Sequence, residues 1–337
     1  MKVAVTGASG FIGGYVVREL IKQGHRVTAL CRSDSSAVPL AKQDVRIAKG
    51  DVRDPDSLTN FCQDQECIVH GVAVMGGYGT WDRFYKIGVE GTENIIEAAT
   101  NAKVQRFIHL SSMTVYGTRP RSVRISEALP YDEQPERWNY YVRQKVLSEK
   151  LVWEAHNQGK ISATAFRPSL VLGPGDRNVV ARTLRFLRSP FRALIGNGSN
   201  RVACVLVEEL ARTVVRSASL PVTMGKAYNL SGSSPITQLD YLNFHASAAG
   251  LPPIRRQMPV NLVKLSCATM EWIYNLLGRE DEPFCTRIAT ALISTHLEVD
   301  CSLAVKELDW AGAGNYEEAI RLSVEWYLKH EHVVRRR

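Results

Sequence analysis

Tyr141 and Lys145 are four residues apart in the stretch YVRQK, which lies within a pattern that predicts a helix. This spacing places the two side chains on one helical face, about one turn from each other. An unperturbed tyrosine titrates at about 10, too high for proton transfer at neutral pH, but a nearby lysine ammonium favours the phenolate and lowers that pKa. Ser112 lies just beyond the carboxyl end of a predicted strand, where α/β sheets bind their ligands. These three side chains are therefore candidates for acid–base catalysis.

Three glycines lie at intervals of three residues in the stretch TGASGFIG, directly after a strand predicted at 2–6. The first permits a tight turn, the second lets the backbone approach a pyrophosphate, and the third lets the following helix pack close to the sheet. The free N–H groups at the start of that helix face the anion. An ordinary turn between a strand and a helix is the alternative interpretation. The predicted pyrophosphate site comprises Gly7, Ser9, Gly10, Phe11, Ile12 and Gly13.

Arg32 and Ser33 follow the second predicted strand. At this position, dinucleotide-binding folds that use NAD carry an acid against the ribose 2′-hydroxyl. A guanidinium there forms charge-assisted hydrogen bonds with a 2′-phosphate instead. The sequence therefore favours NADP(H) over NAD(H) as the cofactor, and the alternative is a surface arginine at a strand end.

Strands and helices alternate along the first half of the chain. Apolar runs predict strands at 2–6, 25–30, 45–47, 67–72, 106–110 and 163–167. Helical periodicity predicts helices at 13–23, 90–101 and about 139–156. Strands separated by helices form parallel sheets that are covered on both faces. The predicted fold class is therefore α/β, with a Rossmann-type, doubly wound parallel sheet.

The second half of the chain has a looser pattern. Helices are predicted near 178–189, 207–219, 237–249, 259–278 and 315–329, with short strands between them. We predict a dinucleotide-binding domain at 1–172 and a smaller, mixed α/β substrate-binding domain at 173–337. Segments near 205–235 are expected to return to the first domain.

Four motifs occur in order along the chain: TGASGFIG, SSMTVYG, YVRQK and FRPSLVLGPGD. Together they resemble the extended short-chain dehydrogenase/reductase family, within the NAD-dependent epimerase/dehydratase superfamily, over essentially the whole chain. The resemblance implies that Tyr141 donates or accepts the proton, that Lys145 lowers its pKa and binds the nicotinamide ribose, and that Ser112 holds the substrate oxygen. The remaining cofactor contacts that it implies, at the adenine and beside the nicotinamide, are Asp51, Val52, Pro168 and Leu170.

Two features bring the resemblance closest to one branch of the family. Arg32 stands where nucleotide-sugar epimerases and dehydratases usually carry an acid, and residues 166–168, Phe-Arg-Pro, replace an asparagine-bearing segment. Both features resemble the 3β-hydroxysteroid dehydrogenase branch and its bacterial relatives. The resemblance implies an NADP(H)-dependent enzyme, expected to be a homodimer, that interconverts a ketone and a secondary alcohol on a lipid-like or steroid-like substrate. Gly88 departs from the family pattern, which often has an asparagine there, and this departure leaves the proton route open.

Two other functions stay open at this point. One is epimerisation or dehydration of a nucleotide sugar, in which a tightly held NAD is reduced and reoxidised within one turnover. The other is a non-catalytic dinucleotide-binding scaffold or redox sensor. Such a protein has no need of Ser112, Tyr141 and Lys145 together, so their presence favours an enzyme.

The composition narrows the class of protein further. Of the 337 residues, 45% are hydrophobic and 23% charged, which is typical of a folded globular protein. The formal net charge is +8, but no zinc spacing, RNP-type motif or basic-aromatic pattern accompanies it, so we predict no nucleic-acid partner. The histidines show no metal-ligand spacing, so no metal site is predicted.

The cysteines and the apolar segments bear on location. Seven cysteines form no CxxC pair, and their odd number argues against a secreted disulfide framework. The chain starts without a visible export signal, and its longest apolar region, 258–277, is interrupted by charged residues. We therefore expect reduced thiols, no transmembrane segment and a cytoplasmic location.

Three segments carry candidate contacts to a substrate or partner. The loop predicted at 75–81, with Tyr78 and Trp81, is either a lid over an apolar substrate or a surface loop. The helix at 260–277 lines a lipid pocket, touches the surface of a membrane or belongs to the core. Four arginines at helical spacing either bind an acidic substrate, carrier or membrane or form a solvated basic face. They are Arg182, Arg185, Arg188 and Arg192.

Overall fold

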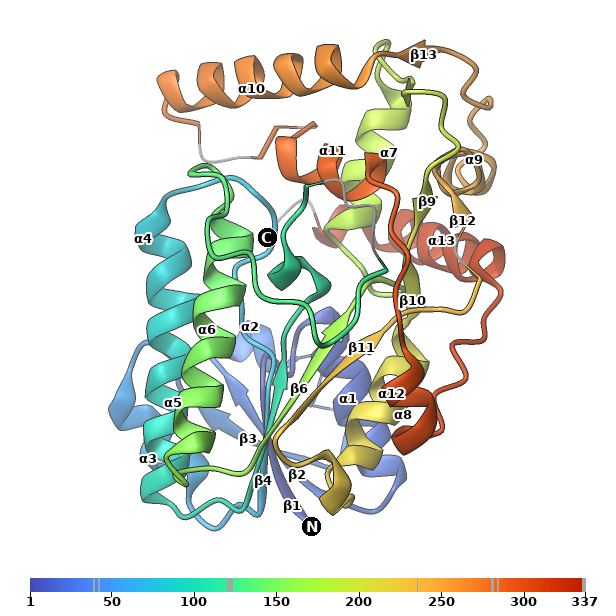
Figure 1. Cartoon of the computed structure of the whole chain (residues 1–337). Helices are drawn as coiled ribbons and strands as arrows, with labels where there is room; N and C mark the ends of the chain where they lie inside the picture. The colour runs from blue at the N-terminus through green and yellow to red at the C-terminus, as the bar shows by residue number, and fades with distance from the viewer. Residues whose placement is uncertain are drawn as a thin grey trace.

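The structure is a computed structural model that describes residues 1–38, 40–41, 43–119, 124–234, 236–279, 282–283 and 285–334 (Figure 1). Within these residues, the main sheet has seven strands, and each neighbouring pair is parallel. This arrangement confirms the predicted α/β fold with a Rossmann-type sheet. The spatial order is β11 (Lys226–Leu230), β6 (Ala163–Pro168), β5 (Arg106–Leu110), β4 (Cys67–His70), β1 (Lys2–Thr6), β2 (Arg26–Cys31) and β3 (Val45–Lys49).

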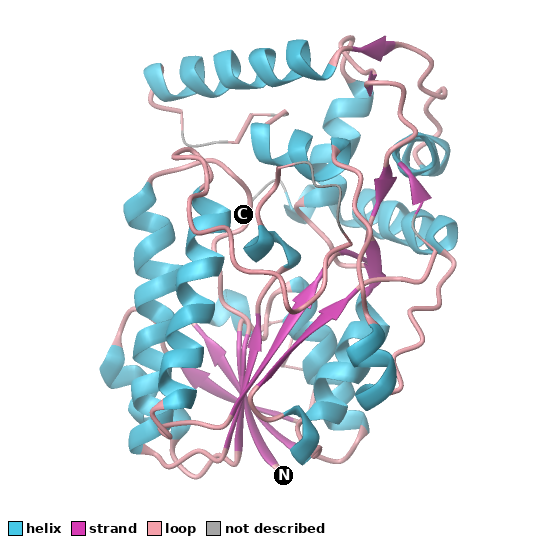
Figure 2. Ribbon diagram, viewed as in Figure 1, coloured by secondary structure: helices cyan, strands magenta, loops and turns pink. Residues whose placement is uncertain are grey.

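Helices cover both faces of the sheet, and each layer buries an apolar cluster against it (Figure 2). One layer is formed by α1 (Phe11–Lys22), α8 (Val207–Ser217) and α12 (Ser302–Leu308). The other is formed by α3 (Pro55–Cys62), α5 (Gly91–Asn101) and α6 (Tyr140–Asn157). The strand order reverses between β1 and β4, and a crevice at such a switch point is where open α/β sheets bind ligands.

A smaller part lies beyond the carboxyl ends of the strands. Its core packs between α7 (Val179–Arg188), α9 (Gln238–Ala248) and α13 (Tyr316–Val334). Three short strand pairs accompany these helices: β7 (Leu170–Leu172) with β10 (Cys204–Leu206), β9 (Arg201–Val202) with β12 (Ile236–Thr237), and β8 (Leu194–Ile195) with β13 (Gln257–Met258). Two further helices, α10 (Val260–Leu276) and α11 (Arg287–Ser294), lie at the far end from the sheet (Figure 1). The domain division at residue 172 stays a prediction.

Several elements differ from the sequence-based expectation. Helix α1 starts at Phe11 rather than at residue 13, because Gly10 in extended conformation is its N-cap, and β4 ends at His70 rather than at residue 72. The sequence did not predict α2 (Asp34–Ala37), α3, α4 (Trp81–Phe84), α11 or α12, all of which are too short to show a clear helical period. It also missed the π-helix η1 (Tyr85–Glu90), which runs into α5, and the 3₁₀ turns η2 (Met113–Tyr116) and η3 (Pro221–Thr223).

Candidate active site

The turn between β1 and α1 requires glycine at positions 7 and 13. Gly7 adopts a left-handed φ of 69°, and the Gly10 N–H donates to the Gly7 carbonyl at 2.9 Å. A Cβ on Gly13 would overlap that same carbonyl oxygen, so the helix packs against the turn only because residue 13 has no side chain. The first turn of α1, from Phe11 to Gly13, presents backbone N–H groups that have no partner within the helix. These features fit the pyrophosphate of a dinucleotide.

Arg32, Ser33, Asp51 and Val52 lie at the carboxyl ends of β2 and β3. Arg32 is exposed and forms no ion pair with any residue that the structure describes, so its guanidinium is available to an anion. Ser33 is the N-cap of α2, where its hydroxyl accepts from the Ser36 N–H. Asp51 is held by Arg53 at 2.8 Å, and hydrogen bonds from that side chain lower the pKa of the carboxyl. Val52 is buried.

Ser112, Tyr141 and Lys145 come together where β5 ends and α6 begins. Tyr141 lies beside Ser112, and the Lys145 ammonium donates to the Leu110 carbonyl at 2.8 Å. Burial raises the pKa of Tyr141, which corrects the sequence-based expectation of a lowered value, and the neighbouring Ser112 hydroxyl only opposes this effect. Burial also lowers the pKa of Lys145 to about 8. Tyr141 is therefore a neutral phenol at pH 7, able to donate a proton.

A buried ion pair lies one helical turn along α6 from Lys145. Glu149 follows Tyr141 and Lys145 at the same four-residue interval, on the same face of the helix. Its carboxylate pairs with the Arg167 guanidinium of β6 at 2.6 Å. The same carboxylate accepts hydrogen bonds from Ser111, Tyr131 and Trp153. Because Ser111 precedes Ser112, this pair holds the backbone that carries the candidate catalytic hydroxyl. The four-residue spacing of Tyr141, Lys145 and Glu149 was a signal in the sequence for Glu149. No local pattern indicated its partner, Arg167.

Gly88 lies in the π-helix η1, where Gln144 occupies the space that a side chain would need. A Cβ on Gly88 would overlap Oε1, the side-chain amide oxygen of Gln144. The backbone conformation of Gly88 does not itself require glycine. Gln144 is fully buried and binds Val74 twice, donating to its carbonyl at 2.6 Å and accepting from its N–H at 3.3 Å. An amide on the helix that carries Tyr141 and Lys145 thus fills the space at position 88, where the resemblance implied an asparagine. Here it anchors the backbone that follows β4.

Comparison with known proteins assigns the chain to a family. The sequence pattern of the NAD dependent epimerase/dehydratase family matches residues 3–231. The chain belongs to this family. The assignment confirms the predicted resemblance to extended short-chain dehydrogenases/reductases and the prediction of an NAD(P)-dependent oxidoreductase.

Individual relatives of this epimerase/dehydratase family member differ in what they act on. A 2-alkyl-3-oxoalkanoate reductase from Shewanella oneidensis is 28% identical over 94% of this chain and 84% of its own length. A 3 beta-hydroxysteroid dehydrogenase/Delta 5-->4-isomerase from Mycobacterium tuberculosis is 29% identical over 74% of this chain and 70% of its own. The crystal structure of gox2253 has a TM-score of 0.78 at 26% identity, covering 97% and 98% of the two chains. The UDP-glucuronic acid 4-epimerase from Bacillus cereus, in complex with NAD, shares the fold with a TM-score of 0.75 at 18% identity, covering 98% and 99%.

Candidate substrate contacts lie on the segment after β4. The Tyr78 hydroxyl donates to the Arg279 carbonyl at 2.8 Å, so this tyrosine is fastened to the segment after α10. Trp81 is not in a loop, because it begins α4, where its ring packs on Tyr140 and under the Arg143 guanidinium. Pro168 is the last residue of β6, at the carboxyl end of the main sheet, and Leu170 begins β7.

The four arginines at helical spacing contact the protein's own acceptors. Arg182 pairs with Glu282 at 2.6 Å, and Arg185 donates to the carbonyl of that same residue at 3.1 Å. Arg188 lies 3.5 Å from Glu331, and Arg192 donates to two backbone carbonyls. In this family member these side chains therefore hold parts of the chain together and do not form an open basic face.

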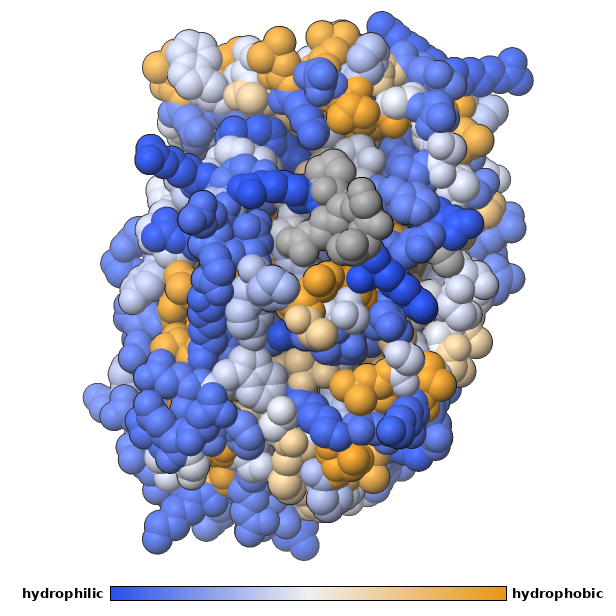
Figure 3. Space-filling view, viewed as in Figure 1, coloured by the Kyte–Doolittle hydropathy of each residue, from blue (hydrophilic) through white to orange (hydrophobic). Residues whose placement is uncertain are grey.

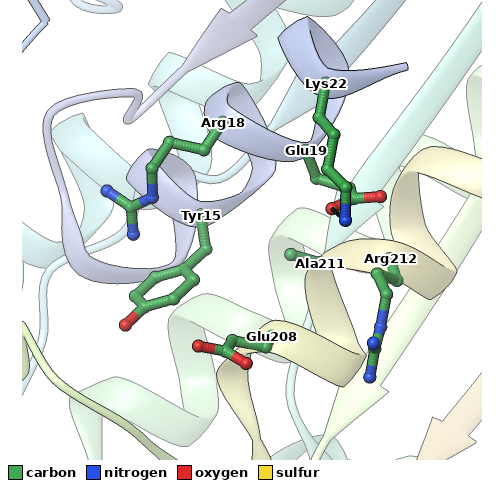
Figure 4. Close-up of a pocket in the computed structure, with 7 residues that line it drawn as sticks. All are labelled: Tyr15, Arg18, Glu19, Lys22, Glu208, Ala211 and Arg212. Carbon is green, nitrogen blue, oxygen red and sulfur yellow. Dashed lines mark ion pairs between the residues drawn. The ribbon is translucent and has the colours of Figure 1, made fainter.

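A separate recess of about 210 Å³ lies between α1 and α8 (Figure 4). It is lined by four residues of α1 and three of α8, namely Tyr15, Arg18, Glu19, Lys22, Glu208, Ala211 and Arg212. None of these belongs to the predicted cofactor or catalytic set. The recess is therefore distinct from the candidate active site.

Proposed function

We propose that this protein is an NADP(H)-dependent oxidoreductase that interconverts a ketone and a secondary alcohol on a lipid-like or steroid-like substrate. The observation that carries the proposal is the group of Ser112, Tyr141 and Lys145 at the carboxyl end of β5, in which Ser112 and Lys145 are buried and Tyr141 is half-buried. Relatives described as a reductase of 2-alkyl-3-oxo acids and as a 3β-hydroxysteroid dehydrogenase support the substrate class.

Proton transfer in the proposed reaction is the task of Tyr141. The phenol donates its proton to the carbonyl oxygen, and Ser112 donates a hydrogen bond to the same oxygen. The Lys145 ammonium, with donors to spare beyond Leu110, would hold the nicotinamide ribose and stabilise the phenolate that remains. When bound, the nicotinamide supplies the hydride. A protonated Tyr141 is the form that ketone reduction requires, since the phenol then has a proton to donate.

Arg32 is proposed to select NADP(H) by binding the 2′-phosphate. Replacing it with alanine is expected to weaken NADPH binding about tenfold or more, since a charge-assisted hydrogen bond contributes about 1.5–3 kcal/mol. The affinity for NADH, which lacks the phosphate, should change by less than about twofold. Fluorescence titration of both nucleotides measures this difference. Arg53→Ala, on the neighbouring loop, is the control, and equal losses for the two nucleotides in Arg32→Ala would show that Arg32 does not read the phosphate.

Turnover with defined probes separates the proposed function from its alternatives. We expect NADPH oxidation with a 2-alkyl-3-oxo acid or NADP⁺ reduction with a 3β-hydroxysteroid, and no epimerisation of UDP-glucose. Nucleotide released on denaturing the purified protein provides a second test. Stoichiometric NAD together with sugar epimerisation would establish the epimerase alternative and remove the ketone reductase.

We further propose that α10 rests on an anionic membrane surface, which would bring the enzyme to a lipid-like substrate. The solvent face of α10 carries an apolar stripe beside polar residues such as Lys264 and Asn275: Leu265, Trp272 and Leu276 are 65%, 64% and 70% exposed, so this stripe is not core (Figure 3). Residues 252–279 contain four cations but a single carboxylate, Glu271, which is buried against Arg287. No helix in the described part of the chain is long and apolar enough to span a membrane. An apolar helix face flanked by cations is typical of an interfacial helix.

Sedimentation with vesicles tests this contact. The protein is expected to sediment with vesicles of phosphatidylcholine and phosphatidylglycerol, and more weakly with phosphatidylcholine alone. A Leu265→Ser/Trp272→Ser/Leu276→Ser variant should bind at least about tenfold more weakly, since each buried apolar side chain contributes about 1.5–3 kcal/mol. The control is Val222→Ser/Val305→Ser, which changes two exposed apolar side chains elsewhere. No vesicle binding, or a dimer that the triple variant disrupts, would contradict the proposal.

The oligomeric state and the cellular location are also proposals. We propose a homodimer, as the family resemblance implies, and a cytoplasmic location, which the odd number of cysteines without a CxxC pair favours.

A further inference from the structure

The helices α10 and α11 are joined at one contact point that contains two cysteines. Cys267 and Glu271 are the buried residues of α10, and they lie one turn apart on the same face. The Cys267 Sγ is 2.7 Å from the Cys285 Sγ, and both sulfurs contact the Thr290 hydroxyl, at 3.3 and 3.5 Å. One turn further along, Glu271 binds Arg287 through its backbone N–H at 2.7 Å and its guanidinium at 2.6 Å. A thiol pair and an ion pair therefore connect the two helices side by side.

Cys285 differs chemically from the other cysteines of the chain. A hydrogen bond from Cys267 lowers the pKa of the Cys285 thiol to about 7. Burial raises the pKa of the other thiols, to about 12 for Cys62 and Cys67 and to about 11 for Cys301. Cys285 is also partly exposed, whereas Cys267 is buried behind it. A partly exposed thiolate next to a second thiol is the arrangement in which a thiol reacts and its neighbour resolves the product.

We propose that Cys267 and Cys285 are a site of reversible disulfide formation that reacts with low-molecular-weight disulfides such as oxidised glutathione. The Cys285 thiolate attacks one sulfur of glutathione disulfide, which forms a mixed disulfide and releases one glutathione thiolate. Cys267 then loses its proton and attacks the Cys285 sulfur, which forms the Cys267–Cys285 bond and releases the second glutathione. Two protein thiols are oxidised, and one glutathione disulfide is reduced to two thiols. The sulfurs need to approach by less than 1 Å to reach the bond length of about 2.05 Å.

The cross-link would lie close to residues that contact the loop after β4. In the sequence between the two cysteines, the Arg279 carbonyl accepts from Tyr78, and the Glu282 carboxylate accepts from the Gly77 N–H at 3.1 Å. Glu282 also pairs with Arg182 of α7. A disulfide between Cys267 and Cys285 would limit how far α10 can move away from the residues that lead into α11. An effect of this link on substrate turnover rests on the proposed function, but formation of the disulfide does not.

Mass spectrometry of the full chain tests the proposal directly. The protein is equilibrated in oxidised and reduced glutathione, quenched in acid, alkylated and digested. We expect a peptide that links Cys267 to Cys285 and disappears on reduction, while the other five thiols are alkylated. In the reduced protein at pH 7, Cys285 should alkylate more than about tenfold faster than Cys301, because its thiolate fraction is far larger.

Matched variants make the result decisive. In Cys267→Ser the linked peptide should be absent and a glutathione adduct should persist on Cys285, whereas Cys301→Ser should still form the link. A stable glutathione adduct on Cys285 in the unsubstituted chain, or alkylation of both thiols after oxidation, would overturn the proposal. Since no substrate is used, failure of the reductase assignment would leave this result unchanged.

Discussion

Replacing Tyr141 with phenylalanine is expected to lower ketone turnover by about 10²–10⁴-fold while the affinity for NADPH stays within about twofold. The reason is that the phenol is the proposed proton donor beside Ser112, whereas the removed hydroxyl is proposed to make no contact with the adenine half of the cofactor. The loss should appear in kcat and in kcat/KM alike, because proton transfer is needed only in the transition state. Stopped-flow measurement of NADPH oxidation, with nucleotide affinity measured separately by fluorescence, checks both parts.

Tyr140→Phe is the matched control for this variant. Tyr140 precedes Tyr141 in α6, but its ring packs against Trp81 and Phe84 instead of facing Ser112. We expect nearly normal turnover for Tyr140→Phe. If Tyr141→Phe retained a near-normal rate, or if Tyr140→Phe lost as much, Tyr141 would not be the proton donor.

Removing the Glu149 carboxylate is expected to destabilise the fold by about 3–5 kcal/mol, the cost of leaving a buried partner charge uncompensated. Glu149→Leu leaves the buried guanidinium of Arg167, a residue of β6, without its anion. It also leaves the hydroxyls of Ser111 and Tyr131 and the indole N–H of Trp153 without their acceptor. Urea unfolding, followed by circular dichroism, measures the loss of unfolding free energy.

Two further variants test whether the loss of stability comes from the burial of the ion pair or from the loss of any one charge. Lys150 of the same helix pairs with Glu133 at 2.5 Å on the surface, so Glu133→Gln should cost no more than about 1 kcal/mol. Glu149→Leu/Arg167→Met removes both buried charges and should recover a large part of the lost stability. Equal effects of Glu149→Leu and Glu133→Gln would show that the buried pair is not the determinant.

Local patterns in the chain were sufficient for six of the seven strands of the main sheet, all but β11, and for naming the candidate residues of the site. The alternation of apolar runs with helical periods predicts parallel strands, because side-chain periodicity depends only on near neighbours in the sequence. The glycine spacing and the four-residue step from Tyr141 to Lys145 are local in the same sense, and the family motifs carried Ser112 with them. Helix α10 was likewise predicted from its period, since its stripe recurs at helical spacing.

The partners of these residues come from distant parts of the chain, and only the folded structure brings them together. Helical spacing places Glu149 on the face of Lys145, but its role depends on Arg167, which arrives from β6. The same is true of Gln144 against Gly88 and of Cys285 against Cys267. The pKa of Tyr141 is raised because packing removes water from the hydroxyl, an effect that no local pattern reveals. Whether the apolar stripe of α10 is buried or exposed was decided in the same way, by which elements the fold packs against it.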